Sequence, residues 1–523
     1  MAAAPVDGVE RKDPLKEIAQ PFIDLVRAPR ALWGINLAYF LEGWVYFGML
    51  GYLAMHFSDF IFQGVPNPDV HSHHMVMVLT AGITIAMFFL GTVADKRGVR
   101  RTLLLAFCFL LAGRILISIA PAVFPTTGLW SALHLLTMAG ILVVVAGYGM
   151  YQPAAYAGVR KFTSAKNAAM GYAMLYALMN LGGWLPTFFS PIRRSIGITG
   201  AYWVYTALTA IALIVTFLIL TPKIEAAAIA RAEREREGDK EKQAADAAGG
   251  IASDKAAPVA YDRDRRIPVH LWIMLALIAG CVVFLPSPAD FIVWGVIAAA
   301  ILVLGFVPAL GVPARRWFAN HPLSDVKFFF FIFALIPVQT LFTYNWLVLP
   351  QYLERAFEGS FVSENFEVFS NMNPILIFIA VPIITALTFR KKVYNMMIIG
   401  TAVMAAPAFL LGLSTSLPAL LGYLFVMTIG EAMWQPRFLQ YAAEIAPEGR
   451  TGAYMGVAQF PWFLTKMLVP LYSGIFMQKY CPAEGARDPE TMWLFFACLA
   501  AVSPLLLIAA RGWVGKDFKS KAA

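Results

Sequence analysis

The chain has 523 residues, of which 59% are hydrophobic and only 14% are charged, with a net charge of +9 and a mean hydropathy of +0.66. A soluble domain carries about 25% charged residues, and so few charges cannot cover a surface that faces water. The composition therefore excludes a cytosolic enzyme, a nucleic-acid binder and a disordered scaffold. The four cysteines show no paired spacing, so they indicate neither a disulfide framework nor a zinc site.

Long apolar segments recur along the chain. A bilayer core needs about 20 apolar residues per helix. The segments that meet this requirement are 32–56, 74–94, 102–121, 129–151, 168–190, 201–221, 268–286, 290–311, 327–350, 373–389, 393–413, 417–441, 453–478 and 491–511. They predict an all-α integral membrane protein with 14 transmembrane helices.

The basic residues are distributed unevenly between the two sides of this topology. With the N-terminus inside, 33 of the 41 Lys and Arg residues fall in inside segments and 5 in outside loops. Lys and Arg concentrate in cytoplasmic loops, so both termini are predicted to be cytoplasmic and the helix number to be even. The asymmetry does not distinguish fourteen helices from twelve.

Segment 222–267 divides the chain. It packs 20 charges, ten of each sign, into 46 residues, which is typical of a solvated linker. The predicted organisation is a cytoplasmic N-terminal segment (1–31), a six-helix bundle (32–221), the charged cytoplasmic linker (222–267), an inserted helical pair (268–311), a second six-helix bundle (312–511) and a cytoplasmic tail (512–523).

The loop after the second helix reads Gly91-Thr-Val-Ala-Asp95-Lys96-Arg97-Gly98-Val-Arg100-Arg101. It resembles the loop signature of the major facilitator superfamily, Gly-x-x-x-Asp-Arg/Lys-x-Gly-Arg/Lys-Arg/Lys. The resemblance implies the major facilitator fold, in which two six-helix bundles rock about a midplane site. Gly98 permits a tight turn, and Asp95 can pair with a cation or a helix N-terminus. We predict a conformational latch formed by Gly91, Asp95, Lys96, Arg97, Gly98, Arg100 and Arg101.

Further motifs follow one another in a family-like order. They are Gly147-Tyr-Gly149-Met-Tyr-Gln152-Pro153, Tyr176-Ala-Leu-Met-Asn180-Leu-Gly182-Gly183, Asn373-Pro374 and Gly430-Glu431. In this order they resemble the proton-dependent oligopeptide transporter family, whose bacterial members carry an inserted helical pair where 268–311 lies. The resemblance implies a proton-coupled secondary transporter, with symport and peptide transport as the family's activity.

Four positions depart from that family. Tyr39 stands in place of a Glu, Gly43 in place of an Arg and Gln152 in place of a Lys, and the stretch Ile336-Pro-Val338-Gln339 lacks the family's acidic residue before Gln. In the family, the missing cations take part in holding a peptide carboxylate and in proton coupling. Their loss points to a modified peptide, a peptide-derived metabolite or an unrelated small organic solute.

Two carboxylates lie midway along predicted helices, where a charge usually marks a transport pathway or an ion pair. Glu431 is predicted to bind substrate and to couple protons; the alternative is a structural pair with Lys466. Glu42 is predicted to carry protons. With no neighbouring Arg, it is expected to be protonated much of the time unless Arg114 reaches it; the alternative is a neutral Glu bonded to Tyr or Asn.

Other residues complete the predicted substrate site. Asn180 and Gln152 can donate hydrogen bonds to a substrate carbonyl, or they can join helices. Aromatic side chains can line a cavity or cradle a cation, or serve only as packing. The predicted substrate-binding set is Glu431, Asn180, Gln152, Tyr39, Tyr46, Trp434 and Lys466. The cluster His71-Ser-His73-His74 is interpreted as a solvated loop rather than a metal site.

The sequence thus predicts a secondary active transporter, working by alternating access in the cell (inner) membrane. The expected partners are a small-molecule substrate, the proton and the lipid bilayer, with a monomeric state and no nucleic acid, metal or cofactor. No phosphate loop and no nucleophile elbow is found, which argues against an ATP-driven pump and against an enzyme. The alternatives are a proton-antiporting exporter of drugs or metabolites and a membrane sensor that binds solute without transporting it.

Overall fold

The computed structural model describes residues 29–90, 93–163, 165–248, 266–281, 307–388, 391–445 and 457–514, with residues 298, 302 and 454. Within these ranges every regular element is a helix. Nine helical stretches of the described residues are long and apolar enough to cross a membrane. The prediction of an all-α protein with membrane-spanning helices is therefore confirmed for the described residues.

The first group of helices forms what we call the N half. It comprises α2 (Arg30–Met55), the π-helical η1 (His56–Ile61), α3 (Pro68–Leu90), α4 (Val93–Arg97), α5 (Val99–Val123), α6 (Ala132–Phe162), α7 (Ala165–Trp184), η2 (Leu185–Phe189) and α8 (Ser190–Ile219). The linker helix α9 (Pro222–Ala248) follows it. The first part of the predicted charged linker, 222–267, is thus helical.

The second group forms the C half. It comprises α13 (Val326–Ala334), α14 (Ile336–Leu347), α15 (Leu349–Ala356), α16 (Phe361–Glu364), α17 (Phe366–Ser370), α18 (Met372–Thr388), α19 (Val393–Ala405), α20 (Ala408–Leu413), α21 (Leu417–Ile445), α23 (Phe460–Tyr480) and α24 (Pro489–Ala509). Before it come α10 (Val269–Cys281), α12 (Pro308–Asn320) and the short η4 (Pro322–Ser324).

Helices occupy all the spans predicted for the two six-helix bundles. Of the inserted pair, α10 begins the first predicted helix, whereas most of 290–311 lies outside the described residues. Residues 312–327, between two predicted spans, were expected to be an inside loop, but the first part of this segment is helical and belongs to α12. This helix has Pro308 in its first turn. Proline is tolerated there because the first-turn N–H groups need no helical partner.

Proline also divides a predicted helix. The segment 327–350 was expected to be one span, but α13 ends at Ala334 and α14 starts at Ile336, just before Pro337. A proline disfavours the helical conformation of the residue before it and lacks the N–H for the ladder. The break leaves Val326–Leu347 as one membrane-crossing unit with an internal joint.

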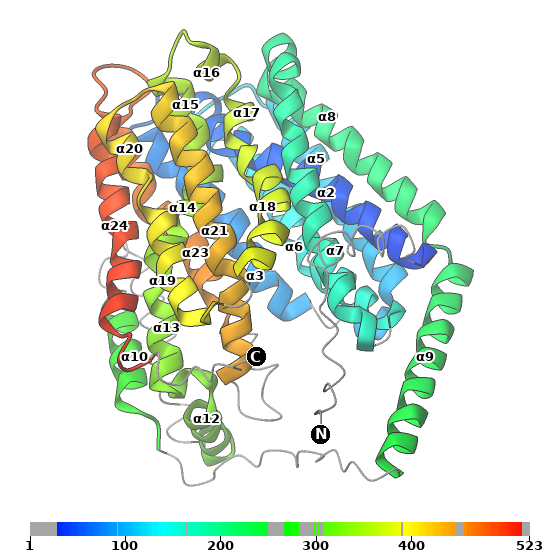
Figure 1. Ribbon diagram of the computed structural model, residues 1–523. Coiled ribbons are helices and arrows are strands. Elements are labelled where there is room, and N and C mark those ends of the chain that lie inside the picture. The colour runs from blue at the N-terminus through cyan, green and yellow to red at the C-terminus, as the bar shows by residue number, and fades with distance from the viewer. Residues whose placement is uncertain are drawn as a thin grey trace, which may run out of the picture.

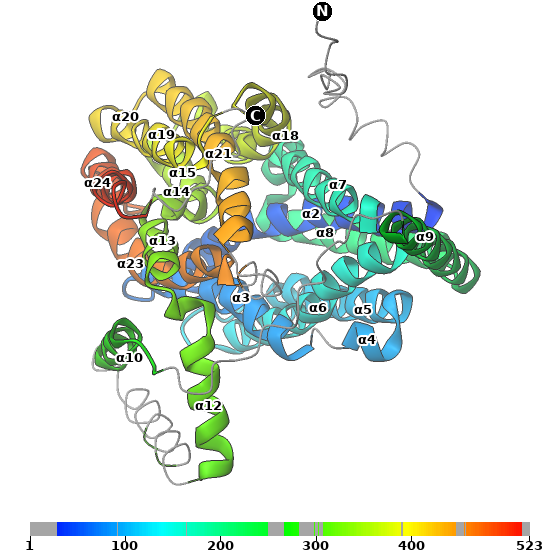
Figure 2. The same cartoon turned by 60° about the horizontal axis from the view of Figure 1, so that its bottom comes forward.

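The two halves stand side by side, with α3 packed on α23 and α7 on α18 where they meet (Figures 1 and 2). We call the end formed by η1, α15, α16 and α17 the gate face, and the end from which α9 and α12 extend the linker face (Figure 1). Both segments predicted to be inside, α9 and α12, lie at the linker face. The predicted sidedness is therefore internally consistent.

Glycine permits the closest helix packing inside the C half. A Cβ atom added to Gly430 of α21 would overlap the backbone of Met404 on α19 and lie 2.8 Å from the carbonyl oxygen of Gly400. The backbones must touch for α21 to place its following residue, Glu431, in the bundle. A backbone neighbour cannot move aside as a flexible side chain can.

We therefore expect Gly430→Ala to destabilise the protein by about 1–3 kcal/mol, the range for overpacking a filled interior. Gly51→Ala is the matched control, since its Cβ meets no atom within 4 Å. Thermal unfolding of both variants in the same detergent measures the effect. Equal melting temperatures would contradict the proposed role of Gly430.

Candidate functional site

A cavity lies between the two halves, beneath the gate face. The N half contributes Phe47 and Tyr52 from α2 and Asn180 from α7. The C half contributes residues of α14, α17 and α18, among them Asn345 and Asn373. Predicted site residue Asn180 thus lines a space that both halves enclose, as a midplane site between repeats requires.

Glu431 lies directly behind this cavity. Its carboxylate accepts hydrogen bonds from Asn373 Nδ2 at 2.8 Å and from Gln435 Nε2 at 2.9 Å, and the residue is 1% exposed. Asn373 also lines the cavity and so connects the carboxylate to it. Four carboxylates are fully buried among the described residues, and Glu431 alone among them has no ion pair there.

The alternative pairing with Lys466 is not observed. Lys466 lies on α23 at its contact with α3, where its carbonyl accepts a 3.4 Å hydrogen bond from Thr80. No ion pair joins Lys466 to Glu431 in the described residues. Neither charge has an ion-pair partner among the described residues. A proton or a cationic group can therefore still neutralise Glu431, and an anionic group can pair with Lys466.

Glu42 forms a buried ion pair with Arg114. Arg114 of α5 pairs with its carboxylate through both terminal nitrogens, one of them at 2.9 Å, and Tyr148 donates a further hydrogen bond. Arg114 also donates to Thr209 at 2.7 Å. A bidentate arginine forms strong charge-assisted hydrogen bonds with a carboxylate, so the condition attached to the expectation, that Arg114 reach Glu42, is met.

The predicted aromatic residues fall into different environments. Tyr39 stacks on Tyr151 with ring centroids 5.3 Å apart, and Tyr46 meets the edge of Tyr148 at 5.2 Å. These rings surround the Glu42–Arg114 pair rather than the cavity beside Glu431. Gln152 is half-buried on α6, next to Tyr151.

Trp434 is a packing residue in this structure. Its ring is 1% exposed, and its Nε1 donates to Met404 Sδ at 3.0 Å. It does not line the cavity between the halves. Although it follows Glu431 by only three residues, it is on the side of α21 that faces α19.

The predicted latch loop contacts its own half. Gly98 has φ +83°, a conformation that favours glycine, and it begins α5. Arg100 N–H donates to Glu225 of α9 at 3.1 Å, and its side chain donates to the carbonyl of Leu220 at 2.6 Å. Gly91 lies outside the described residues. The described contacts thus attach the loop to the end of α8 and to the linker helix.

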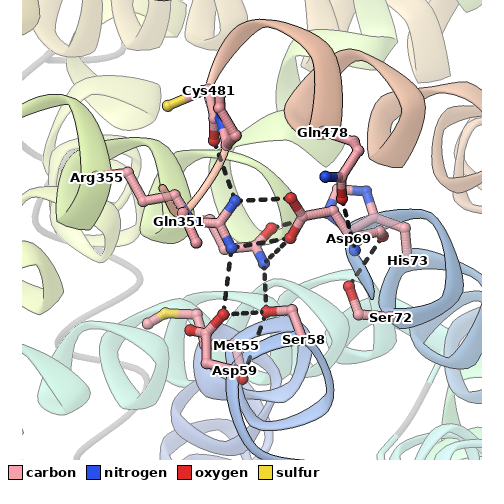
Figure 3. A network of polar contacts seen from close by, with 12 residues as sticks. Met55, Ser58, Asp59, Asp69, Ser72, His73, Gln351, Arg355, Gln478 and Cys481 are labelled. Carbon is pink, nitrogen blue, oxygen red and sulfur yellow. Dashed lines mark hydrogen bonds and ion pairs between the residues drawn. The ribbon is translucent and has the colours of Figure 1, made fainter. Parts of the chain in front are cut away.

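Sequence reasoning missed a polar network at the gate face, which Figure 3 shows. Arg355 of α15 donates to both carboxylate oxygens of Asp69 on α3, at 2.7 and 2.8 Å, and contacts Asp59 at 3.2 Å. Gln351, one turn before Arg355, donates to Ser58 at 3.1 Å. The C half thereby binds two segments of the N half.

His73 belongs to the same network and not to a solvated loop. Its Nε2 is 2.9 Å from Gln351 Oε1 and its Nδ1 is 2.7 Å from Ser473 Oγ, with the ring fully buried. Gln351 and Ser473 lie on α15 and α23, both in the C half. The interpretation of 71–74 as a solvated loop is therefore wrong for this residue, because α3 starts at Pro68 and carries His73 into the interface.

A second gate cluster is centred on Glu367 of α17. Its carboxylate pairs with Arg193 of α8 and accepts hydrogen bonds from Tyr52 at 2.9 Å and from Ser190 at 2.8 Å. Arg194 pairs with Glu364 nearby, at 3.5 Å. Every ion pair between the halves in the described residues lies at the gate face, so the structure is closed there.

The comparisons with known proteins agree with this architecture. The family model described as Major Facilitator Superfamily matches residues 32–470. The chain therefore belongs to the major facilitator superfamily and is a multi-pass membrane transporter rather than an enzyme. The comparison with curated proteins found no match.

Solved structures of similar fold are transporters of the POT family. A peptide transporter POT in complex with sulfate has a TM-score of 0.61 at 16% identity and covers 97% of this chain and 99% of its own. The POT family transporter PepTSo has a TM-score of 0.63 at 16% identity, covering 93% and 99%. A POT family transporter in complex with 5-aminolevulinic acid has 0.60 at 17%, covering 94% and 97%. At these identities the likeness shows the fold.

We expect Arg355→Ala to open the gate face, since it leaves Asp69 buried without a cation. Spin labels at Thr127 and Ala486, in exposed loops of opposite halves, report the separation by electron paramagnetic resonance. The population of long distances should rise at least fivefold. Arg487→Ala is the matched control, because the described partners of Arg487 all lie in the C half. An unchanged distance distribution would contradict the role of Arg355.

The gate face should also respond to pH. Burial, reinforced by Asp59, raises the pKa of Glu354 to about 7, against the opposing effect of Arg193 and Arg355. An exposed Glu titrates near 4.3, so closing takes up a proton. Acidification from about pH 7 to about pH 4.5 should favour the closed state, with no further gain outside that window. The same spin labels measure this shift, and Glu354→Gln should abolish most of it.

Proposed function

We propose that this transporter moves a small organic solute together with protons, by alternating access between the two faces. The observation that supports it best is the position of Glu431. This fully buried carboxylate has only neutral hydrogen-bond donors around it and is joined to the interhalf cavity by Asn373. An unpaired charge at this depth is costly, and a functional role is the default expectation.

Glu431 can be neutralised in two ways that suit a transport cycle. It can take up a proton, or it can accept the ammonium group of a solute that enters the cavity. If the two compete for one carboxylate, solute binding and proton binding are linked. Glu42 is the second proposed proton site, because a proton on Glu42 would release Arg114 from its pair.

The gate face is proposed to face outward and the linker face the cytoplasm, in the cell membrane. This orientation follows from the basic residues that the sequence places around α9 and α12. The described state is then closed to the outside. The cycle requires the Asp69–Arg355 and Glu367–Arg193 pairs to separate, and water then replaces each ion's partner, which limits the cost.

Gradient-driven uptake into proteoliposomes tests this function. With a library of amines and small peptides and an imposed pH gradient of either direction, we expect uptake of at least one solute to follow the proton gradient. Glu431→Gln should reduce that uptake at least tenfold, because the variant can neither bind a proton nor carry a charge. Glu484→Gln, in an exposed loop, is the matched control.

The direction of coupling separates the remaining alternatives. Uptake driven by protons moving with the solute indicates symport, and uptake driven by the opposite gradient indicates an exporting antiporter. Solute binding without any flux across the sealed membrane would indicate a sensor. Gradient-driven uptake that Glu431→Gln leaves intact would contradict the proposed role of the carboxylate.

A further inference from the structure

Four asparagines line the interhalf cavity, and three of them donate a hydrogen bond to the protein through their side-chain nitrogen. Asn373 Nδ2 donates to the carboxylate of Glu431, Asn371 Nδ2 to the carbonyl of Glu367, and Asn180 Nδ2 to the carbonyl of Tyr176 at 2.8 Å. Carboxylates and backbone carbonyls only accept, so these contacts fix the orientation of each amide. The Oδ1 atoms of Asn371 and Asn373 accept no hydrogen bond from the described residues and are acceptors for a solute.

One amide is oriented the other way. Asn345 Oδ1 accepts a 2.9 Å hydrogen bond from Tyr423, while its Nδ2 is buried with no partner in the described part of the chain. The residue is 4% exposed and lines the cavity. A buried donor without a partner is unfavourable, so a solute carbonyl or hydroxyl oxygen would stabilise it.

The described lining contains an acid and no base. Glu367 lines the cavity, and its arginine partner, Arg193, does not. Glu431 adds a second negative charge, one side chain behind Asn373. The charge of Glu367 is balanced by its pair with Arg193. A carboxylate entering this space would therefore meet the unpaired negative charge of Glu431 and no lining cation, whereas an ammonium group would be attracted to Glu431.

Aromatic rings make up much of the remaining wall. Phe47, Phe342, Trp346 and Phe366 line the cavity together with Tyr52. Such rings bind apolar groups and, through their faces, organic cations. The described lining therefore combines acceptors for N–H groups, two buried groups without a partner that can donate (Asn345 Nδ2 and Ser370 Oγ), negative charge and aromatic surface.

We infer that this cavity selects organic cations, meaning amines with an apolar or aromatic group and a neutral carbonyl or hydroxyl but no free carboxylate. The inference rests on the proposed transport function and names its substrate class. The solute's ammonium group lies among Asn180, Asn371 and Asn373, on the Glu431 side, and its carbonyl oxygen accepts from Asn345. Zwitterionic and anionic solutes are excluded because no cation of the described lining receives their carboxylate.

Three probes built on one dipeptide test the selectivity by calorimetric titration of the purified full-length protein. They are phenylalanyl-alanine amide, a cation; phenylalanyl-alanine, a zwitterion; and N-acetyl-phenylalanyl-alanine, an anion. The amide should bind at least tenfold more tightly than the zwitterion, and the anion should not bind. Equal or tighter binding of either acid, or no binding of the amide at millimolar concentration, would overturn the inference.

A substitution in the cavity wall makes the test specific to this site. Asn180→Lys places a cation in the lining and should raise affinity for the zwitterion while lowering affinity for the amide. Asn180→Gln, neutral and of intermediate length, should keep the wild-type order. An amide preference that persists unchanged in a folded Asn180→Lys protein would show that the solute binds elsewhere, against the inference.

The titration needs no membrane gradient, so its outcome is separable from the transport assay. A preserved amide preference without gradient-driven flux would refute the proposed transport but not the selectivity of the cavity. Gradient-driven uptake of zwitterions, lost in Glu431→Gln, would support the transport function and refute the selectivity.

Discussion

Burying a charged side chain away from water is costly unless an opposite charge lies within hydrogen-bond distance. Much of the described structure depends on this constraint. Three of its four fully buried carboxylates, Glu42, Asp69 and Glu367, each pair with an arginine. Each pair joins helices far apart in sequence. The first fixes α2 against α5 within one half, and the other two fix one half against the other. The exception, Glu431, adjoins the cavity that the halves enclose.

The position of a pair decides whether it can take part in a conformational cycle. Glu42 and Arg114 lie in one rigid bundle, surrounded by Tyr148 and Thr209, so the rocking of the halves leaves them together. Asp69 and Arg355 lie in different halves and near the end of the bundle, where water reaches the charges once the halves part. The cost of separation is then set by hydration rather than by an apolar interior. The same geometry that closes the gate face thus allows it to open.

Hydropathy was sufficient to predict where the described helices of the two bundles lie, and the rule that membrane-depth charges are usually functional pointed to Glu42 and Glu431 as candidates. Partner choice was not predictable. Whether Arg114 reaches Glu42 depends on the rotation and register of α5, which hydropathy does not determine. Asp69 and Arg355 are 286 positions apart and lie near helix ends, where charges are common and carry no distinguishing pattern. Only the three-dimensional contact reveals them as a pair.

Position 43 in α2, where the resembled oligopeptide transporter family has an arginine, connects helix packing with the selectivity inferred for the cavity. Gly43 replaces this arginine, and a Cβ atom there would lie 2.7 Å from the carbonyl oxygen of Met179 on α7. The contact between α2 and α7 is therefore too close for any side chain at position 43. An arginine at position 43 would require these helices to move apart, which would also displace Asn180 from the cavity wall. The close packing of α2 and α7 thus leaves no room for a cation at position 43, and a cation is accommodated more readily at the cavity-lining position 180.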